Sequence, residues 1–260
     1  MKKVLENSSA AAFGLVSFQH LNTFEVRSRA RIPQNAMTVA AMVFPYYNKN
    51  ILDGNVSGYC AVADYHIVVM EQLKSICDAL KEKYPHNSFV PFVDSSPIDE
   101  VDMAVRAGLG VKGDNSLLIT PKWGSFVFIG EIVTDLCTDT VLCADTGCSH
   151  CGRCKNACPG GATGDGFVKK ENCASHISQK KGELTQEETD ILKRAKTVFG
   201  CDICQKVCPH NKDIPTGDNL FGGDIVNTVD REIIQNGYKQ RAFGFRGAKV
   251  LERNLQIYEE

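Results

Sequence analysis

Cysteine spacing constrains the fold of this chain more than any other feature of its sequence. Eight of the twelve cysteines lie in or between two short runs, each of which is closed by a Cys-Pro pair. The first run extends from Cys148 to Pro159 and the second from Cys201 to Pro209, with Cys173 between them. A 4Fe–4S cluster is held by four thiolates, and two-residue gaps between cysteines let one loop supply three of them. The pattern therefore predicts a module with two iron–sulfur clusters, and with it a role in electron transfer.

The ligand set of each predicted cluster follows from the position of the Cys-Pro pair. In two-cluster ferredoxins, the cysteine before the proline binds the cluster of the other run. One cluster is therefore predicted to use Cys148, Cys151, Cys154 and Cys208. The other is predicted to use Cys158, Cys173, Cys201 and Cys204. Zinc sites and structural disulfides remain as alternatives. However, neither kind of site usually shows three equally spaced cysteines together with a Cys-Pro pair that occurs in two runs.

The other four cysteines and the overall composition are those of an ordinary globular protein. Cys60, Cys77, Cys137 and Cys143 have no metal-binding spacing, and we expect them to be reduced core or loop residues. At 260 residues, with 43% hydrophobic and 23% charged residues, the chain can form one large domain or two modest ones. No apolar stretch reaches the roughly 18 residues of a membrane helix, and the first residues do not resemble a signal peptide. With so many cysteines, this predicts a reducing, cytoplasmic location and no membrane partner.

Hydrophobic spacing predicts a mixed helix and strand region before the cysteine module. Apolar runs at 11–18 and 38–44 are typical of buried strands. Residues 64–83 carry apolar side chains at helical intervals, and the following Tyr-Pro pair ends that helix. The segments 116–120 and 125–133 are predicted to form a β-hairpin. Further helices are expected after each cysteine run and near 228–236 and 247–258.

A glycine motif precedes the predicted hairpin. Gly108, Gly110 and Gly113 match the G-x-G-x-x-G fingerprint of dinucleotide-binding proteins. That fingerprint requires a strand before the glycines and a helix after them, whereas here a helix is expected at 99–107 and a strand at 116–120. Nicotinamide binding is therefore not favoured. The glycines either let the backbone turn tightly or let it approach a flat ligand closely.

Two polar residues are candidates for chemistry. Asp94 follows an apolar strand and lies in a loop bounded by prolines, where a partly desolvated carboxyl could donate a proton. Asp94 could equally belong to a helix-capping loop, because Ser95, Ser96 and Asp99 precede a helical stretch. His66 could be a ligand or an acid, although a core or capping histidine is the commoner outcome. The residues by themselves leave these alternatives open.

The ordered combination of these motifs resembles the epoxyqueuosine reductase family, cobalamin-dependent enzymes of tRNA queuosine synthesis. The resemblance extends over residues 37–215, with a weaker continuation in the tail. It is carried by the cysteine module, Asp64-Tyr65-His66, Val93-Asp94-Ser95-Ser96-Pro97, Arg106 to Gly110, Gly113, Asn115, Gly124-Ser125, Gly130-Glu131, Phe245-Arg246-Gly247 and Arg253-Asn254. It implies an α+β fold with three parts. These are a nitroreductase-like α/β domain at 1–142, a bacterial-ferredoxin-like double 4Fe–4S domain at 143–215, and a helical tail at 216–260.

The resemblance also implies a mechanism. In that family the two domains hold cobalamin between them, the clusters pass electrons to cobalt, and the epoxide oxygen is removed. Asp94 corresponds to the family's essential aspartate, which implies that it is the catalytic proton donor. The implied cofactor contacts are Tyr65, His66, Asp94, Ser95, Gly108, Gly110, Gly113, Asn115, Ser175 and His176. His66 is not expected to bind cobalt, because the glycine of the Asp-x-His-x-x-Gly cobalamin motif is missing.

The chain departs from the family pattern in two places, which leaves the substrate and partners open. Longer family members continue into helical repeats that help to hold tRNA, and the loop around Gly113 has Asp114 where the family has lysine. The acidic residue opposes binding of phosphate-rich RNA, and the formal charge of −2 adds no general attraction. We expect an external low-potential donor of the ferredoxin or flavodoxin type, and tRNA as a possible partner. The alternatives are a corrinoid-dependent reductase of a small molecule, related to reductive dehalogenases, and a non-catalytic two-cluster electron carrier.

Overall fold

The chain divides into two compact units. The computed structural model describes residues 1–260 except 141–146, 218 and 223. Unit 1 comprises Met1–Pro45, His66–Lys112 and Leu117–Cys148, and unit 2 comprises Tyr46–Tyr65, Gly113–Ser116 and Ser149–Glu260. The expected boundary between residues 142 and 143 lies outside the described residues. The segments 46–65 and 113–116, which we expected in the first domain, pack in unit 2, and the expected separate tail from residue 216 packs there as well.

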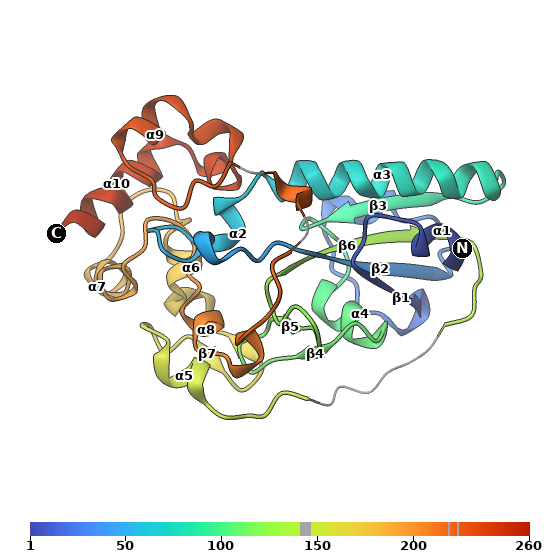
Figure 1. The fold of residues 1–260 in the computed structure, drawn as a ribbon, viewed down its shortest axis with the longest axis horizontal. Helices are drawn as coiled ribbons and strands as arrows, with labels where there is room; N and C mark the ends of the chain where they lie inside the picture. Colours follow the sequence, from blue (N-terminus) through green and yellow to red (C-terminus); the bar gives the residue numbers. More distant parts are fainter. Residues whose placement is uncertain (141–146, 218, 223) are drawn as a thin grey trace. The chain divides into compact units, whose positions relative to one another are not determined.

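A four-stranded antiparallel sheet forms the centre of unit 1 (Figure 1). In spatial order its strands are β1 (Ala12–Ser17), β2 (Thr38–Pro45), β6 (Val127–Thr134) and β3 (Phe89–Val93). The two strands predicted from apolar runs are confirmed by β1 and β2. Every residue of β2 is buried, which explains why this strand reads as an unbroken apolar run.

The predicted hairpin between 116–120 and 125–133 is wrong. The strand β6 is central in the sheet and pairs with β2 on one side and with β3 on the other. Because both edges of β6 are occupied, the short strand β5 (Leu118–Ile119) pairs instead with β4 (Val111–Lys112). An isolated bridge joins Thr120, the last residue of the first predicted segment, to Gly124 in the predicted loop.

Helices cover both faces of this sheet (Figure 1). The long helix α3 (Tyr65–Lys83) buries Val69 and Leu73, which contact Gly130 of β6, as its helical spacing predicts. On the other face, α4 (Glu100–Arg106) joins the core through Met103 and Ala104. The remaining helical segments of unit 1 are α1 (Lys2–Glu6), η1 (Phe18–His20) and η2 (Arg27–Arg31). This packing fixes the end of β3, which directly precedes Asp94.

Unit 2 consists mainly of short helices. Its α-helices are α2 (Gly58–Ala61), α5 (Arg153–Ala157), α6 (Ala174–Ile177), α7 (Gln186–Ala195), α8 (Ile203–Lys206), α9 (Arg231–Asn236) and α10 (Ala248–Glu259). Its 3-10 helices are η3 (Lys49–Ile51), η4 (Lys170–Asn172), η5 (Pro209–Asn211), η6 (Asn219–Phe221), η7 (Tyr238–Gln240) and η8 (Ala242–Arg246). One small hairpin joins β7 (Thr163–Gly164) to β8 (Phe167–Val168). The helices α9 and α10 agree with the two predicted near the C-terminal end, but α5 and α8 lie inside the cysteine runs rather than after them.

The C-terminal helix packs within unit 2 because its apolar and polar side chains both find partners there. Ile257 of α10 contacts a small core formed by α6 and α7. The Arg253 guanidinium donates to the carbonyl oxygen of Lys180, and the buried Asn254 amide donates to those of Ser178 and Val198. These contacts anchor α10 to the segment that carries Cys201, so residues 248–259 belong to unit 2.

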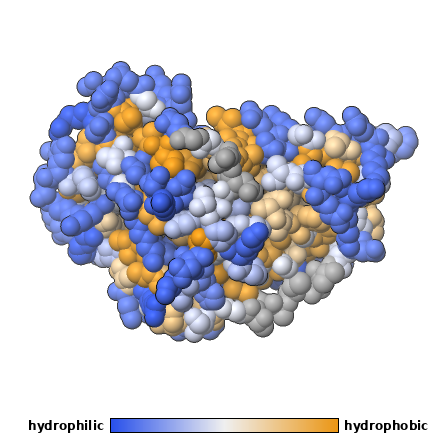
Figure 2. Space-filling view, viewed as in Figure 1, coloured by the Kyte–Doolittle hydropathy of each residue, from blue (hydrophilic) through white to orange (hydrophobic). Residues whose placement is uncertain are grey.

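The surface mixes polar residues with apolar ones (Figure 2). Among the large apolar side chains that stay exposed are Phe245 and Ile67, at 61% and 57% of their full accessibility. No described helix has the length and apolar character needed to cross a lipid bilayer. Ile67 directly follows one of the predicted site residues, which places an apolar group at the edge of the candidate site.

Candidate active site and cluster-binding loops

Asp94 lies in a strained turn at the end of β3. Its φ is +57°, a value that residues other than glycine rarely adopt. The Ser95 amide donates to the Val93 carbonyl oxygen at 2.7 Å, so the chain reverses across Asp94 in a single-residue turn. Pairing of Val93 with Gly130 fixes the strand up to this point. Strain of this kind persists only where the surrounding structure imposes it, and it marks the Asp94 loop as a functional candidate.

The turn brings Asp94 to His66. His66 lies in the first turn of α3, and its Nε2 is 3.3 Å from Oδ2 of Asp94. Both side chains are partly open to solvent, at 38% and 57% exposure. The structure therefore brings together two residues that the sequence offered separately, 28 positions apart. A carboxyl group that faces solvent beside an imidazole can give up or receive a proton.

One further carboxyl group, that of Glu100, lies close to this pair, and a second, that of Glu131, lies close to Glu100. Glu100 begins α4, and Glu131 is a fully buried residue in the middle of β6. Burial, with a smaller contribution from the Asp94 carboxylate, raises the pKa of Glu100 to about 8, against the effect of a hydrogen bond from the Asp94 backbone amide. Burial also raises the pKa of Glu131 to about 8, although the Ser96 hydroxyl donates a hydrogen bond to it. Both glutamates are therefore mostly protonated at neutral pH.

Sequence reasoning gave no role to either glutamate. The available signal was the acidic residue at position 131, inside the otherwise apolar strand 127–134. A charged residue in such a strand has to be paired or neutralised, because an isolated buried charge is very costly. Glu100 carried no comparable signal, since acidic residues are common in the first turn of a helix.

The fold accounts for two of the three motif glycines. Gly108, with φ +80°, directly follows α4, and the Gly108 and Leu109 amides donate to the carbonyl oxygens of Val105 and Ala104. This is a Schellman cap, which favours glycine. A side chain on Gly110 would place its Cβ 2.2 Å from the Ile119 carbonyl oxygen, so only glycine fits. The element order, helix before and strands after, agrees with our argument against a dinucleotide site.

Four cysteine thiols of unit 2 lie close enough to influence one another. Burial raises the pKa of Cys201 to about 11, and Cys173 and Cys158 add to that rise. Burial raises the pKa of Cys204 further, again with contributions from the other three thiols. The Ala162 amide donates to Sγ of Cys158 at 3.2 Å, a contact that would stabilise a thiolate. These residues are the set that the crossing rule assigns to the second cluster, and bound iron would supply the positive charge that displaces their protons.

The loop that carries Cys201 and Cys204 is held from both sides. Gly200 has φ +71°, and a Cβ there would lie 2.4 Å from the Cβ of Ser57. The Gly200 amide donates to Oγ of Ser178. The buried Asp202 carboxylate accepts hydrogen bonds from the Ser57 hydroxyl and, at 2.6 Å, from the Gly58 amide. These contacts hold the loop in place on both sides of Cys201 and Cys204.

Comparisons with known proteins identify the family. A family model described as "4Fe-4S double cluster binding domain" matches residues 147–211, and one described as "Epoxyqueuosine reductase QueG, DUF1730" matches residues 28–95. An epoxyqueuosine reductase of Lactococcus garvieae is 30% identical over 257 residues, which cover 92% of this chain and 73% of the relative. The chain belongs to the epoxyqueuosine reductase family. A relative from Listeria monocytogenes is 37% identical over 205 residues, and the match covers 75% of this chain and 54% of that protein.

Solved structures show the same fold. The epoxyqueuosine reductase of Streptococcus thermophilus superposes with a TM-score of 0.83 at 23% identity, over 99% of this chain and 79% of that one. A structure of an epoxyqueuosine reductase with an epoxyqueuosine-modified tRNA stem loop has a TM-score of 0.82 at 22% identity. The match covers 99% of this chain and 80% of that one. A reductive dehalogenase is more distant, with a TM-score of 0.50 at 14% identity. The match covers 96% of this chain and 34% of that one. The predicted family, the mixed α and β fold with a double-cluster module and the oxidoreductase class are confirmed.

The remaining predicted site residues of this epoxyqueuosine reductase family member lie in unit 2. Tyr65 stacks edge-on against Tyr59, with ring centroids 6.3 Å apart. Asn115 is buried, and the Gly113 carbonyl oxygen accepts from the Ser116 amide. Ser175 and His176 lie on α6 directly after Cys173, with His176 exposed. Their contacts with a cofactor remain predictions.

The cysteines outside the second set are placed as follows. Cys151 is exposed, and a hydrogen bond from the Arg153 backbone amide lowers its pKa, which favours the thiolate that a metal needs. Cys154 lies in α5 and Cys208 caps η5, while Cys148 is the last residue of unit 1. Cys60 and Cys77 are buried and Cys137 is exposed, all as free thiols, in agreement with the prediction of core and loop residues. Cys143 lies outside the described residues.

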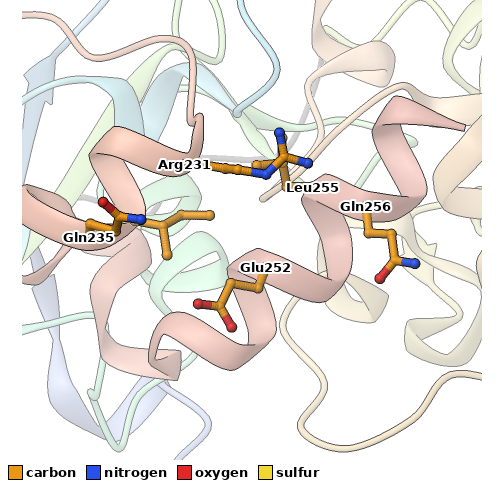
Figure 3. Close-up of a pocket in the computed structure, with 6 residues that line it drawn as sticks. Arg231, Gln235, Glu252, Leu255 and Gln256 are labelled. Atoms are coloured by element: carbon orange, nitrogen blue, oxygen red, sulfur yellow. The ribbon is translucent and has the colours of Figure 1, made fainter.

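A separate pocket lies between α9 and α10 (Figure 3). Its volume is about 310 Å³, and it is lined by Arg231, Ile234, Gln235, Glu252, Leu255 and Gln256. None of the predicted site residues lines it. Its lining contains no cysteine or histidine.

Proposed function

We propose that this chain is a cobalamin-dependent iron–sulfur reductase that removes the epoxide oxygen of epoxyqueuosine in tRNA. The observation that carries the proposal is the pairing of Asp94 with His66 in a strained, solvent-facing turn of a chain with a double-cluster domain. Removing the epoxide oxygen as water consumes two electrons and two protons and leaves a carbon–carbon double bond. Asp94 would deliver one of these protons to the departing oxygen.

The iron–sulfur clusters would be held by the eight predicted cysteines. The mutual influence of Cys158, Cys173, Cys201 and Cys204 supports the second ligand set, because four convergent thiols are the donor set that a 4Fe–4S cluster requires. The first set, Cys148, Cys151, Cys154 and Cys208, rests on spacing and on the matched double-cluster domain. An external ferredoxin or flavodoxin would supply the electrons.

Cobalamin fits the residues around Asp94. Half-exposed His66, exposed Ser95 and the exposed apolar side chain of Ile67 could offer polar and apolar contacts to a large flat cofactor. When bound, cobalamin supplies a reducible cobalt centre. His66 already contacts the Asp94 carboxylate, so we propose that it orients Asp94 and does not bind cobalt. The other proposed cofactor contacts are Tyr65, Gly108, Gly110, Gly113, Asn115, Ser175 and His176.

The tRNA substrate is proposed from the family. One solved relative is described with an epoxyqueuosine-modified tRNA stem loop, and the chain resembles it over 99% of its own length. The chain spans about half of the Listeria relative, so the substrate of the longer proteins is carried over here as a proposal. A cytoplasmic location would follow from a tRNA substrate.

A corrinoid-dependent reductase of a small molecule is the second candidate. Asp114 favours it, because a carboxylate replaces the family's lysine in the loop after Gly113. Its Oδ1 lies 2.8 Å from Nδ1 of His150, so the acidic group is held in place rather than free to move away from a phosphate. Phosphate-rich RNA would be repelled by such a group.

The test is anaerobic reconstitution with iron, sulfide and cobalamin, followed by turnover of an epoxyqueuosine stem loop. We expect cobalamin absorption bands, and a loss of turnover of about 10²-fold or more in Asp94→Asn, since general acids contribute about that much. Asp78→Asn, an exposed aspartate on α3, is the matched control and should retain full activity.

Three outcomes would contradict the proposal. Protein that does not bind cobalamin would exclude the cofactor. Protein that binds cobalamin but does not reduce the stem loop would favour the small-molecule reductase. Full cluster content with no effect of Asp94→Asn on any activity would favour an electron carrier.

A further inference from the structure

An exposed phenylalanine lies next to the segment that carries Cys201. Phe245, in η8, keeps 61% of its full accessibility. Its ring stands edge-on to the ring of Phe199, with the two centroids 6.3 Å apart and 83° between the ring planes. Phe199 is fully buried, and only Gly200 separates it from Cys201 in the chain. A single ring contact therefore joins the surface of unit 2 to a loop that carries predicted cluster ligands.

The inner end of this contact is held in place. The Ser57 amide donates to the Phe199 carbonyl oxygen at 2.8 Å. The ring of Phe243, which is also fully buried, lies 6.2 Å from that of Phe199. The Thr197 hydroxyl donates to the carbonyl oxygen of Gly200 at 2.8 Å. Because both backbone and ring of Phe199 are fixed, a molecule bound over Phe245 would be held in a defined position relative to the cysteine loop.

The chain around Phe245 is basic. Residues 233–251 contain four lysines or arginines and no acidic residue. The Arg246 guanidinium lies over the Phe245 ring, 4.4 Å from its centroid. Lys239 and Lys249 are exposed, and Lys239 packs against Gly244, the residue before Phe245.

Three of these four positive charges are left without an opposite charge. Arg241 forms an ion pair with Asp224. Among the residues that the structure describes, no carboxylate pairs with Lys239, Arg246 or Lys249. An apolar group surrounded by unpaired positive charges is suited to a partner with a negatively charged surface.

An exposed apolar side chain by itself would not define a docking site, because such residues are common on protein surfaces. Phe245 differs in that it combines exposure with unpaired basic neighbours and with a ring contact to the cysteine loop. An RNA-binding surface would use the aromatic ring and the positive charges, but it would gain nothing from the contact with Phe199. A protein that delivers electrons would use all three, since its redox group has to come close to the cluster. Electron-transfer partners also bind through small, transient interfaces.

We propose that Phe245, Arg246, Lys239 and Lys249 form the docking surface for a small acidic electron-carrier protein that reduces the second cluster. The inference rests on the part of the proposed function in which an external donor supplies the electrons. Each encounter transfers one electron: a fully reduced flavodoxin loses one electron and no proton, and one oxidised cluster gains that electron. Two encounters supply the two electrons that removal of one epoxide oxygen consumes.

The test measures how fast reduced flavodoxin reduces the clusters of the anaerobically reconstituted protein. The second-order rate constant is followed by stopped flow at low ionic strength through the loss of cluster absorbance. We expect Phe245→Ala to lower it about tenfold, because apolar anchors dominate such interfaces. Lys249→Glu should also lower it about tenfold, and this loss should disappear at high salt. Binding of oxidised flavodoxin, measured by calorimetry, should weaken in both variants.

Two controls match these variants. Phe167→Ala removes another exposed phenylalanine of unit 2, and Lys74→Glu reverses an exposed charge on α3. Both should be reduced by flavodoxin at the wild-type rate. Dithionite is a small reductant that needs no docking surface, so it should reduce all four variants as fast as wild type. Iron content should be the same in all of them.

Several results would overturn the proposal. These are wild-type rates with flavodoxin in both Phe245→Ala and Lys249→Glu, an equal slowing with dithionite or a loss of iron, and a wild-type protein that flavodoxin does not reduce. Weaker binding of the tRNA stem loop to Phe245→Ala, with unchanged reduction by flavodoxin, would assign the surface to RNA instead. If reduction depends on Phe245 but the stem loop is not turned over, the docking surface stands and the proposed function fails.

Discussion

The stability of the Glu131→Gln variant relative to wild type should rise with pH. In the folded protein the pKa of Glu131 is about 8, whereas its ordinary value is 4.5. Between these values the folded state holds a proton that the unfolded state has released. The free energy of unfolding therefore falls as the pH rises, by about 1.4 kcal/mol for each pH unit. The stability associated with the proton is complete below pH 4.5 and lost as the pH passes 8.

The magnitude follows from that slope. From pH 5 to pH 7 the wild-type protein should lose about 2.5 kcal/mol through this residue, because the unfolded carboxyl is already mostly ionised at pH 5. Glutamine keeps the oxygen that accepts the hydrogen bond from Ser96, and it does not titrate. The variant should therefore lose none of this free energy of unfolding between pH 5 and pH 7. For a chain of this length, about 2.5 kcal/mol corresponds to roughly 5–10 °C in melting temperature.

The assay is the melting temperature of reconstituted protein under anaerobic conditions at pH 5 and pH 7. We expect the advantage of Glu131→Gln over wild type to grow by roughly 5–10 °C between the two pH values. Glu82→Gln should show no such growth, since that side chain is exposed. An advantage that is equal at both pH values, or that shrinks at pH 7, would show that Glu131 is ionised in the folded protein and would refute the reasoning.

Three further substitutions test the cluster loops and the glycine turn. Gly200→Ala should reduce iron content to about one cluster. The new Cβ would lie 2.4 Å from the Cβ of Ser57, and residue 200 has φ +71°, so the substitution should cost about 1–3 kcal/mol. Full iron content in this variant would contradict the prediction. Cys204→Ser should lose iron and change the electron paramagnetic resonance of the reduced protein, whereas the buried Cys77→Ser should alter neither. Gly108→Ala should lower stability by about 1 kcal/mol through the Schellman cap and leave cobalamin affinity unchanged. Weaker cobalamin binding in that variant would instead support the predicted cofactor contact at Gly108.

Much of the architecture was accessible from local patterns. The buried strand β2 and the helix α3 follow from an apolar run and from helical spacing, which depend only on neighbouring residues. The hairpin error arose because strand pairing is decided by which edges remain open in the complete sheet. The position of β6 between β2 and β3 cannot be read from its own sequence.

By itself, the sequence determined the electron-transfer chemistry. The cysteines of each run lie close together in the chain, and their spacing decides whether one loop can surround a cluster. Through family resemblance it also singled out Asp94. Only the tertiary structure decided what lies around Asp94: His66 from α3 and Glu100 from α4, with Glu131 from β6 next to Glu100. These residues are distant in sequence, and the sheet and its two covering helices bring them together. The proton chemistry of the site depends on that burial, since the pKa of a carboxyl group is set by its surroundings in space.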